Sequence, residues 1–144
     1  NLQNKPSIIY GDGEQKRCFS YIDDVVYCLE KMALDEKIKN EIFNIGPDEG
    51  LITINELAKI VANETGFNSM PLHVEDRPQE VKIATCSADK ARKFFNYKTK
   101  TKIEDAVKKT VQFIKERGIK DFDYSLPLEI KNDKTPSTWR DKKI

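Results

Sequence analysis

Residues 9–26 carry the clearest structural signal of the chain, and they read Ile9-Tyr10-Gly11-Asp12-Gly13-Glu14-Gln15-Lys16-Arg17-Cys18-Phe19-Ser20-Tyr21-Ile22-Asp23-Asp24-Val25-Val26. An apolar pair precedes the glycines, and Asp12-Gly13 is typical of a hairpin turn. Asp23 and Asp24 favour a helix start, because acidic side chains cap free N–H groups and meet the positive end of the helix dipole. The stretch therefore predicts a strand, a glycine turn, a second strand and a helix.

Four helices are predicted where apolar residues recur at intervals of three and four. The sequence Thr53-Ile54-Asn55-Glu56 has the form of a capping box, and Gly66 provides a natural end for the helix that follows. The same pattern recurs from Thr101 to Glu104, ahead of a helix that ends at Gly118. The four predicted helices begin near Asp24, Thr53, Ser87 and Thr101. In the first of them, Val25, Leu29 and Met32 are expected to face inward.

Short apolar or alternating runs between these helices predict strands. The candidates are residues 7–10, 18–22, 41–46, 72–74 and 81–83. Since strands and helices interleave, the fold class is α/β, or α+β when the chain is taken alone. We expect residues 1–120 to form one folded portion. Residues 121–144, with two prolines and many charges, are expected to form a surface or partly disordered tail.

The composition excludes several classes of function. The chain has 144 residues, with 25 lysines and arginines against 24 aspartates and glutamates, so its net charge is +1. A dedicated nucleic-acid binder would carry a strong basic excess, so no nucleic-acid partner is expected. No apolar run is long enough to span a bilayer, so no membrane partner is expected either.

Cysteine and histidine usage gives no sign of a metal site. Cys18, Cys28 and Cys86 are widely spaced without a Cys-x-x-Cys pair, which predicts buried or half-buried free thiols in a reducing compartment. We therefore expect a cytoplasmic protein. The single histidine, His73, cannot supply a histidine-rich site and is expected to be structural or solvent-facing.

The spacing within residues 10–26 resembles a motif of the extended short-chain dehydrogenase/reductase family, whose members are NAD-dependent nucleotide-sugar epimerases, dehydratases and decarboxylases. The family pattern is Tyr-Gly-x-Gly-x-Gln-x-Arg-x-Phe-x-Tyr-Val-x-Asp-x-Val, and Ile22 stands where valine is usual. The matching residues are Tyr10, Gly11, Gly13, Gln15, Arg17, Phe19, Tyr21, Asp24 and Val26.

Further matches follow in family order, and the resemblance covers about residues 7 to 118. Phe43-Asn44-Ile45-Gly46 resembles the family's Tyr-Asn-Ile-Gly strand, which joins the sheet of the cofactor domain. Residues 76–81 resemble the Arg-Pro-Gly-Asp/Glu-Val element, with Gln79 in place of glycine. Residues 94–99 fit the Leu-Gly-Trp-x-Pro element more loosely.

Two family motifs are missing: the Gly-x-x-Gly-x-x-Gly turn that seats the cofactor pyrophosphate, and the catalytic Tyr-x-x-x-Lys pair. Tyr27 and Lys31 show the second spacing, but in the helix after the arginine segment, which is the wrong place. The resemblance therefore implies the C-terminal, substrate-binding part of a Rossmann-type enzyme. It implies that NAD is bound by an absent N-terminal half, that the full-length protein is a homodimer, and that this portion alone has no catalytic residue and no activity.

The resemblance also implies roles for five residues. Arg17 and Arg77 should hold a diphosphate from two sides, which suits guanidinium groups because they stay charged and bind phosphate bidentately. Tyr10 lies where the family packs the base, Gln15 would bond base, ribose or phosphate, and Glu80 would accept from ribose hydroxyls. For each arginine, the alternative is a surface salt bridge.

Other functions stay open at this point. The chain could be a small interaction domain without catalysis, or a sensor that binds a nucleotide sugar without reacting. The sequence does not distinguish an epimerase from a dehydratase or a decarboxylase, nor does it identify the sugar. Uridine is the expected base because many family members use it.

Overall fold

The computed structural model describes residues 1–120, 132–135 and 140, so almost all of the predicted tail lies outside the described residues. The four predicted helices are confirmed. In chain order the elements are β1 (Ile8–Tyr10), β2 (Lys16–Arg17), α1 (Ile22–Leu34), the 3-10 helix η1 (Glu36–Ile38), β3 (Ile52–Thr53), α2 (Ile54–Thr65), β4 (Leu72–Val74), β5 (Ile83–Ala84), α3 (Asp89–Phe95) and α4 (Ile103–Arg117).

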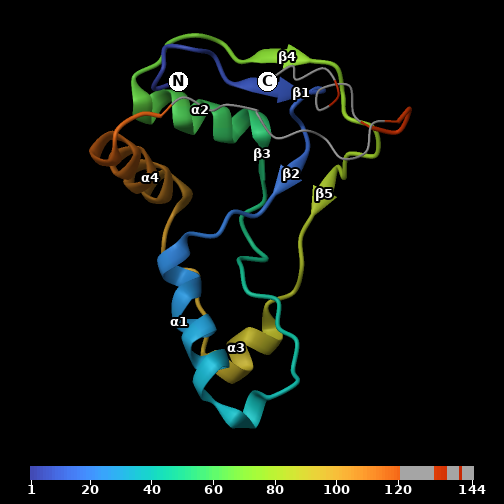
Figure 1. The fold of residues 1–144 in the computed structure, drawn as a ribbon, viewed down its shortest axis with the longest axis vertical. Coiled ribbons are helices and arrows are strands. Elements are labelled where there is room, and N and C mark those ends of the chain that lie inside the picture. The colour runs from blue at the N-terminus through green and yellow to red at the C-terminus, as the bar shows by residue number, and fades with distance from the viewer. Residues whose placement is uncertain (121–131, 136–139, 141–144) are drawn as a thin grey trace.

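The strands form two small sheets. β1 and β4 pair in parallel, and β2 lies between β3 and β5, antiparallel to the first and parallel to the second. Helices α2 and α4 lie at the same end as β1 and β4, whereas α1 and α3 form the opposite end (Figure 1). This alternation of short strands and helices confirms the α/β class.

The predicted hairpin at Asp12-Gly13 is wrong, because β1 and β2 belong to different sheets. The glycine turn itself is present, with φ of +71° at Gly11 and +74° at Gly13. Asn55, in the first turn of α2, hydrogen-bonds to this glycine turn. Its side-chain amide donates to the Asp12 carbonyl at 2.9 Å, and its backbone N–H donates to the Gly13 carbonyl at 3.1 Å. The turn therefore passes the chain from one sheet to the other.

Two other predicted strands are also wrong. Only Lys16–Arg17 form a strand in that region, and α1 begins at Ile22, where the predicted strand ends. Residues 41–46 form no strand in the described structure. Phe43 instead packs on Phe95 of α3 with 4.6 Å between ring centroids, while Ile42 is 85% exposed.

The capping box of α2 is confirmed. Thr53 Oγ1 accepts from the Glu56 N–H at 3.0 Å, and the Glu56 carboxylate accepts from the Thr53 N–H at 2.7 Å. The second predicted capping box is wrong, because Lys102 occupies the N-cap of α4 and its side chain makes no capping bond. Thr101 turns away from the helix and donates its hydroxyl to Asp24 Oδ1 at 3.2 Å.

Asp24 joins α1 to the segment that precedes α4. Its carboxylate is buried and accepts the backbone N–H groups of Lys100 at 3.1 Å and Thr101 at 2.9 Å. Burial by itself raises the pKa of Asp24, but the hydrogen bonds from Thr101 and Lys100 outweigh burial and leave the pKa below its ordinary value of 3.8. The folded structure thus favours the ionised carboxylate.

We expect Asp24→Ala to lower the free energy of unfolding by about 2–4 kcal/mol, because two partly buried backbone N–H groups and the Thr101 hydroxyl lose a charged acceptor. Since the folded pKa lies below the unfolded one, the carboxylate stabilises the fold fully above about pH 4 and progressively less as the pH falls below that value. Urea unfolding at pH 6 and pH 3 measures both effects. Asp24→Asn, which cannot ionise, should lose less stability between these pH values; an equal loss would contradict the assignment.

The hydrophobic core lies between α1 and α3 and contains Cys28, Ile38, Ala88, Ala91, Phe95 and Tyr97. Met32 packs against it as predicted, but Leu29 does not point inward and is 50% exposed. Ile22 and Val26 share its side of α1, at spacings of three and four residues, and are also exposed. One face of α1 is therefore apolar and uncovered by the described residues.

Candidate functional site

The parallel pairing of β1 with β4 brings the segments after both strands to one edge. Tyr10 pairs with Val74, and the Gly11 N–H donates to the Val74 carbonyl at 3.0 Å. Arg77 follows β4 by three residues, and its guanidinium carbon lies 3.8 Å from the centroid of the Tyr10 ring. The fold thus joins two of the predicted site residues in a cation–π contact.

The parallel pairing of β2 with β5 places Glu80 beside Arg17. Arg17 is in register with Ala84, and Glu80 precedes β5 by three residues. Arg17 Nη2 donates to Glu80 Oε1 at 2.7 Å, with 23% and 22% of the two side chains exposed. The ion pair is partly exposed, so an added anion could still reach N–H groups of Arg17 that Glu80 does not occupy.

Gln15 is attached to the first of these pairs through the backbone of Tyr10. It is 7% exposed, and its Nε2 donates to the Tyr10 carbonyl at 3.1 Å. The Glu80 N–H donates to the Arg77 carbonyl at 3.3 Å, which ties the two arginine segments together. The five predicted residues therefore form one connected group, which we call the arginine cluster: Tyr10, Gln15, Arg17, Arg77 and Glu80. Their role in binding stays a prediction.

Arg77 is the less neutralised of the two arginines. Among the described residues no carboxylate forms an ion pair with its side chain, whereas Arg17 is paired with Glu80. Arg77 Nε and Tyr10 Oη are both buried without a hydrogen-bond partner in the described part of the chain. Since buried polar atoms are almost always paired, this part of the cluster lacks a polar partner.

Gln79 adopts φ +63° between Arg77 and Glu80. This left-handed conformation explains why the resembled motif has glycine there, because glycine alone adopts it without a steric penalty. We expect Gln79→Gly to raise the free energy of unfolding by about 0.5–1 kcal/mol, because relief of the left-handed penalty of about 1–2 kcal/mol exceeds the entropic cost of glycine, about 0.5–1 kcal/mol. Thermal unfolding of the full-length protein measures this change, and a lower melting temperature would show that the Gln79 side chain contributes contacts worth more than the backbone strain.

Sequence reasoning missed Asn55 and Asp76 as neighbours of the turn. The Asn55 side chain donates to the Asp12 carbonyl and to the Glu14 carboxylate. Asp76 lies close to Gly11, and a Cβ added at Gly11 would come within 2.8 Å of Asp76 Oδ1. No local pattern signals either contact, because both residues lie far from the turn in sequence. Each limits what can replace a glycine of the turn.

Residues that the sequence singled out elsewhere have structural roles. His73 is exposed, and its Nδ1 donates to the Gly11 carbonyl at 2.8 Å, which confirms the prediction for it. Burial beside Cys28 raises the pKa of Tyr27 to about 12, the opposite of what a tyrosine base needs. All three cysteines are free, but Cys86 is exposed rather than buried because it lies between β5 and α3.

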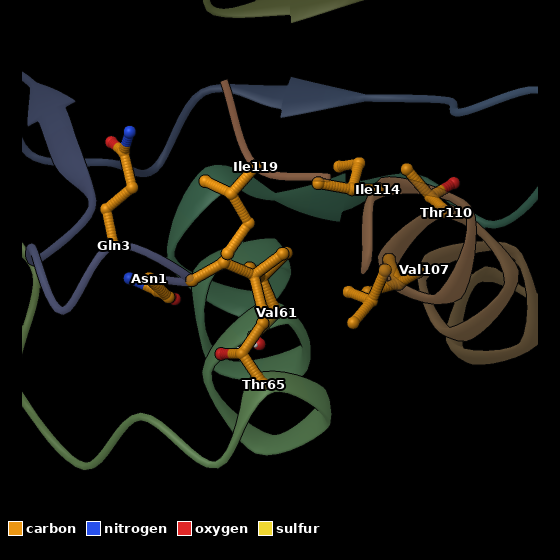
Figure 2. A pocket seen from close by; sticks show the side chains of 10 residues that line it. Asn1, Gln3, Val61, Thr65, Val107, Thr110, Ile114 and Ile119 are labelled. Carbon is orange, nitrogen blue, oxygen red and sulfur yellow. Dashed lines mark hydrogen bonds between the residues drawn. The ribbon is translucent and has the colours of Figure 1, made fainter. Parts of the chain in front are cut away.

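A separate apolar groove of about 420 Å³ lies between α2 and α4. Val61 and Thr65 of α2 face Val107, Thr110 and Ile114 of α4 across it (Figure 2). The other lining residues are Asn1, Leu2, Gln3, Val111 and Ile119. None of the lining side chains is charged, so the groove offers no group that would hold a diphosphate.

Within residues 1–120, 132–135 and 140, no three histidine, cysteine or acidic side chains gather as a metal site would require. In the same residues, no helix has both the length and the apolar character needed to cross a membrane.

Comparison with known proteins shows the family to which the chain belongs. A family model described as GDP-mannose 4,6 dehydratase matches residues 1–110. The chain belongs to this family. It is 32% identical over 114 residues to the UDP-glucuronate 4-epimerase of Thermodesulfobacterium geofontis, covering 79% of this chain and 35% of that protein. It is 30% identical over 121 residues to the UDP-N-acetyl-alpha-D-glucosaminuronate decarboxylase of Bacillus cytotoxicus, covering 80% and 37%.

Solved structures of family members agree with the fold. UDP-glucose 4-epimerase of Thermotoga maritima, solved with UDP-glucose, superposes with a TM-score of 0.71 at 29% identity, over 81% of this chain and 37% of that one. UDP-glucuronic acid 4-epimerase of Bacillus cereus, in complex with UDP-glucuronic acid and NAD, gives 0.72 at 26% identity over the same shares. These matches confirm the resemblance to the nucleotide-sugar epimerases and dehydratases. The chain spans about a third of the length of the curated relatives it matches.

Proposed function

We propose that this chain is the C-terminal, nucleotide-sugar-binding portion of an NAD-dependent epimerase, dehydratase or decarboxylase that acts on a UDP-sugar. The observation that carries the proposal is the arginine cluster, in which two parallel strand pairs place two guanidinium groups on connected segments. The epimerases of T. maritima and B. cereus, solved with UDP-glucose and UDP-glucuronic acid, support uridine as the base.

The two arginines of the cluster can bind a diphosphate, and they differ in how far a carboxylate already neutralises their charge. Arg77 has no carboxylate partner among the described residues, so an anion there would gain a charge-assisted hydrogen bond without displacing one. Arg17 is oriented by Glu80 and by the Lys16 carbonyl, and it keeps N–H donors beyond the two that these partners use. In this proposal the arginines bind the phosphates, and Glu80 holds Arg17 in place.

The described residues do not fit NAD. A dinucleotide site needs a glycine turn that leads from a strand into the N-terminus of a helix. Here the glycine turn leads from β1 into β2, and the Asn55 side chain covers it. We therefore propose that another part of the full-length protein binds NAD and carries the catalytic residues.

The partner of this portion is, in the same proposal, the N-terminal half of the same polypeptide. Ile22, Val26 and Leu29 form an exposed apolar stripe along α1, with 59%, 47% and 50% of their surfaces exposed. Neighbouring exposed apolar side chains of this kind mark an interaction surface. The relatives are more than twice as long as this chain and so have additional residues that could cover it.

The test uses the full-length protein and a panel of UDP-, dTDP- and GDP-sugars with NAD. Calorimetry measures binding, and chromatography of the reaction mixture measures conversion of the sugar. The proposal expects a UDP-sugar to bind and to be converted. Binding without conversion would favour the sensor, and no binding of any nucleotide sugar would favour an interaction domain.

A further inference from the structure

Two short links join the two sheets that carry the arginine cluster. The first link, residues 11–15, leads from β1 to β2, and the second link, residues 75–82, leads from β4 to β5. Tyr10 precedes the first link and Arg17 follows it in β2, while Arg77 and Glu80 lie within the second link. The conformation of the links therefore decides how the Tyr10–Arg77 pair stands relative to the Arg17–Glu80 pair.

The N-terminus of α2 binds the first link through backbone N–H groups. The first N–H groups of a helix have no partner within the helix and are free to bond elsewhere. Here the Ile54 N–H donates to the Gln15 carbonyl at 3.2 Å, and the Asn55 N–H donates to the Gly13 carbonyl at 3.1 Å. These bonds continue the antiparallel pairing of β3 with β2. The first link is thus attached to a helix.

The side chain of Asn55 adds two bonds to the first link. Its Nδ2 donates to the Asp12 carbonyl at 2.9 Å and to the Glu14 carboxylate at 2.7 Å. Its oxygen lies where a Cβ at residue 13 would have to go, so the side chain also fills the space that Gly13 leaves open. None of these contacts involves a side chain of the arginine cluster. An effect of Asn55 on a ligand would therefore pass through the first link.

Other contacts hold the first link less firmly at its middle. His73 of β4 donates to the Gly11 carbonyl, at the start of the link. Lys82 of the second link lies 4.0 Å from Asp12 Oδ1 and 3.5 Å from Asp76 Oδ2, but all three side chains are at least half exposed, and such ion pairs contribute little. The middle of the first link is therefore held from outside chiefly by α2.

We propose that Asn55 is a positioning residue, which fixes the first link and thereby the separation of the Arg17 and Arg77 guanidinium groups for a diphosphate. The inference rests on the proposed function and deepens it, because it gives a part in ligand binding to a residue outside the arginine cluster. Two guanidinium groups bind two linked phosphates well only when their separation matches. This requirement disappears when one arginine is missing, which distinguishes positioning from a general loss of stability.

The test is a double-substitution cycle in the full-length protein, with UDP as the probe and calorimetry as the readout. Asn55→Ala removes the side-chain amide, and Asn55→Asp keeps its size but has no N–H to donate. Since an acidic residue is favourable in the first turn of a helix, Asn55→Asp serves if Asn55→Ala fails to fold. We expect either substitution to weaken UDP binding roughly three- to tenfold when both arginines are present. With Arg77→Ala, the further loss should be less than about twofold.

Asn63→Ala is the matched control, because Asn63 is exposed on the same helix and should leave UDP affinity within about twofold. If the Asn55 variants bind UDP as the unsubstituted protein does, or lose the same factor with and without Arg77, Asn55 does not position the arginines and the inference is overturned. The proposed function would survive either result. If UDP, dTDP and GDP all fail to bind the unsubstituted protein, the proposed function falls, and this inference with it.

Discussion

Replacing Gly13 with alanine is expected to lower the free energy of unfolding by about 2–5 kcal/mol. Gly13 has φ +74°, a conformation that costs other residues about 1–2 kcal/mol. An added Cβ would also collide with the Asn55 side-chain oxygen. Asn55 can move only by giving up its bonds to Asp12 and Glu14, so overpacking adds about 1–3 kcal/mol.

Gly50 provides the matched control. Its φ is also +74°, but an added Cβ would meet nothing within 4 Å. Gly50→Ala should therefore show only the backbone penalty of about 1–2 kcal/mol. Urea unfolding of both variants separates the two contributions, and equal destabilisation would mean that Asn55 does not constrain the turn.

The second large effect concerns Arg17. We expect Arg17→Ala in the full-length protein to weaken UDP binding by about 1.5–3 kcal/mol, the range for hydrogen bonds that involve a charged group. Isothermal titration calorimetry measures the change. Arg117→Ala is the control, because Arg117 ends α4 beside Phe113 and lies outside the arginine cluster. If the two variants bind UDP equally well, Arg17 has no part in binding.

Local signals predicted the helices well because their determinants are close in sequence. The Thr53–Glu56 capping box and Gly66, with φ +69°, act within a few residues of the helix ends that they set. Strand pairing is different. β1 and β2 pair with β4 and β5, which lie more than sixty residues later in the chain, and no local pattern specifies such partners. The turn at Asp12-Gly13 therefore looked like a hairpin until those partners were known.

The second capping box failed for a related reason. Thr101 has the right neighbours for a helix cap, but the buried carboxylate of Asp24 competes for its hydroxyl and N–H and is the better acceptor. Tertiary contact overrode local preference at that position. The same carboxylate is one of the residues through which the family resemblance was recognised, and its observed role is structural.

For the site, the sequence predicted which residues belong together but not how they touch. Arg17 and Arg77 were expected to hold a diphosphate from two sides, and the structure adds that one is paired with a carboxylate and the other with an aromatic ring. Gln15 was expected to contact the ligand, which stays a prediction; its amide nitrogen donates within the cluster, to the Tyr10 carbonyl. Side-chain partners of this kind depend on register between strands, which the sequence did not reveal.

The most direct measurement is the affinity of UDP for the full-length protein with both Arg17→Ala and Arg77→Ala, compared with the unsubstituted protein. Loss of two charge-assisted contacts is expected to weaken UDP binding by about 2.5–5 kcal/mol, somewhat less than additively if both arginines bind one phosphate. Uridine affinity should stay unchanged, because uridine has no phosphate to lose. A doubly substituted protein that binds UDP as tightly as the unsubstituted one would show that Arg17 and Arg77 do not bind the diphosphate.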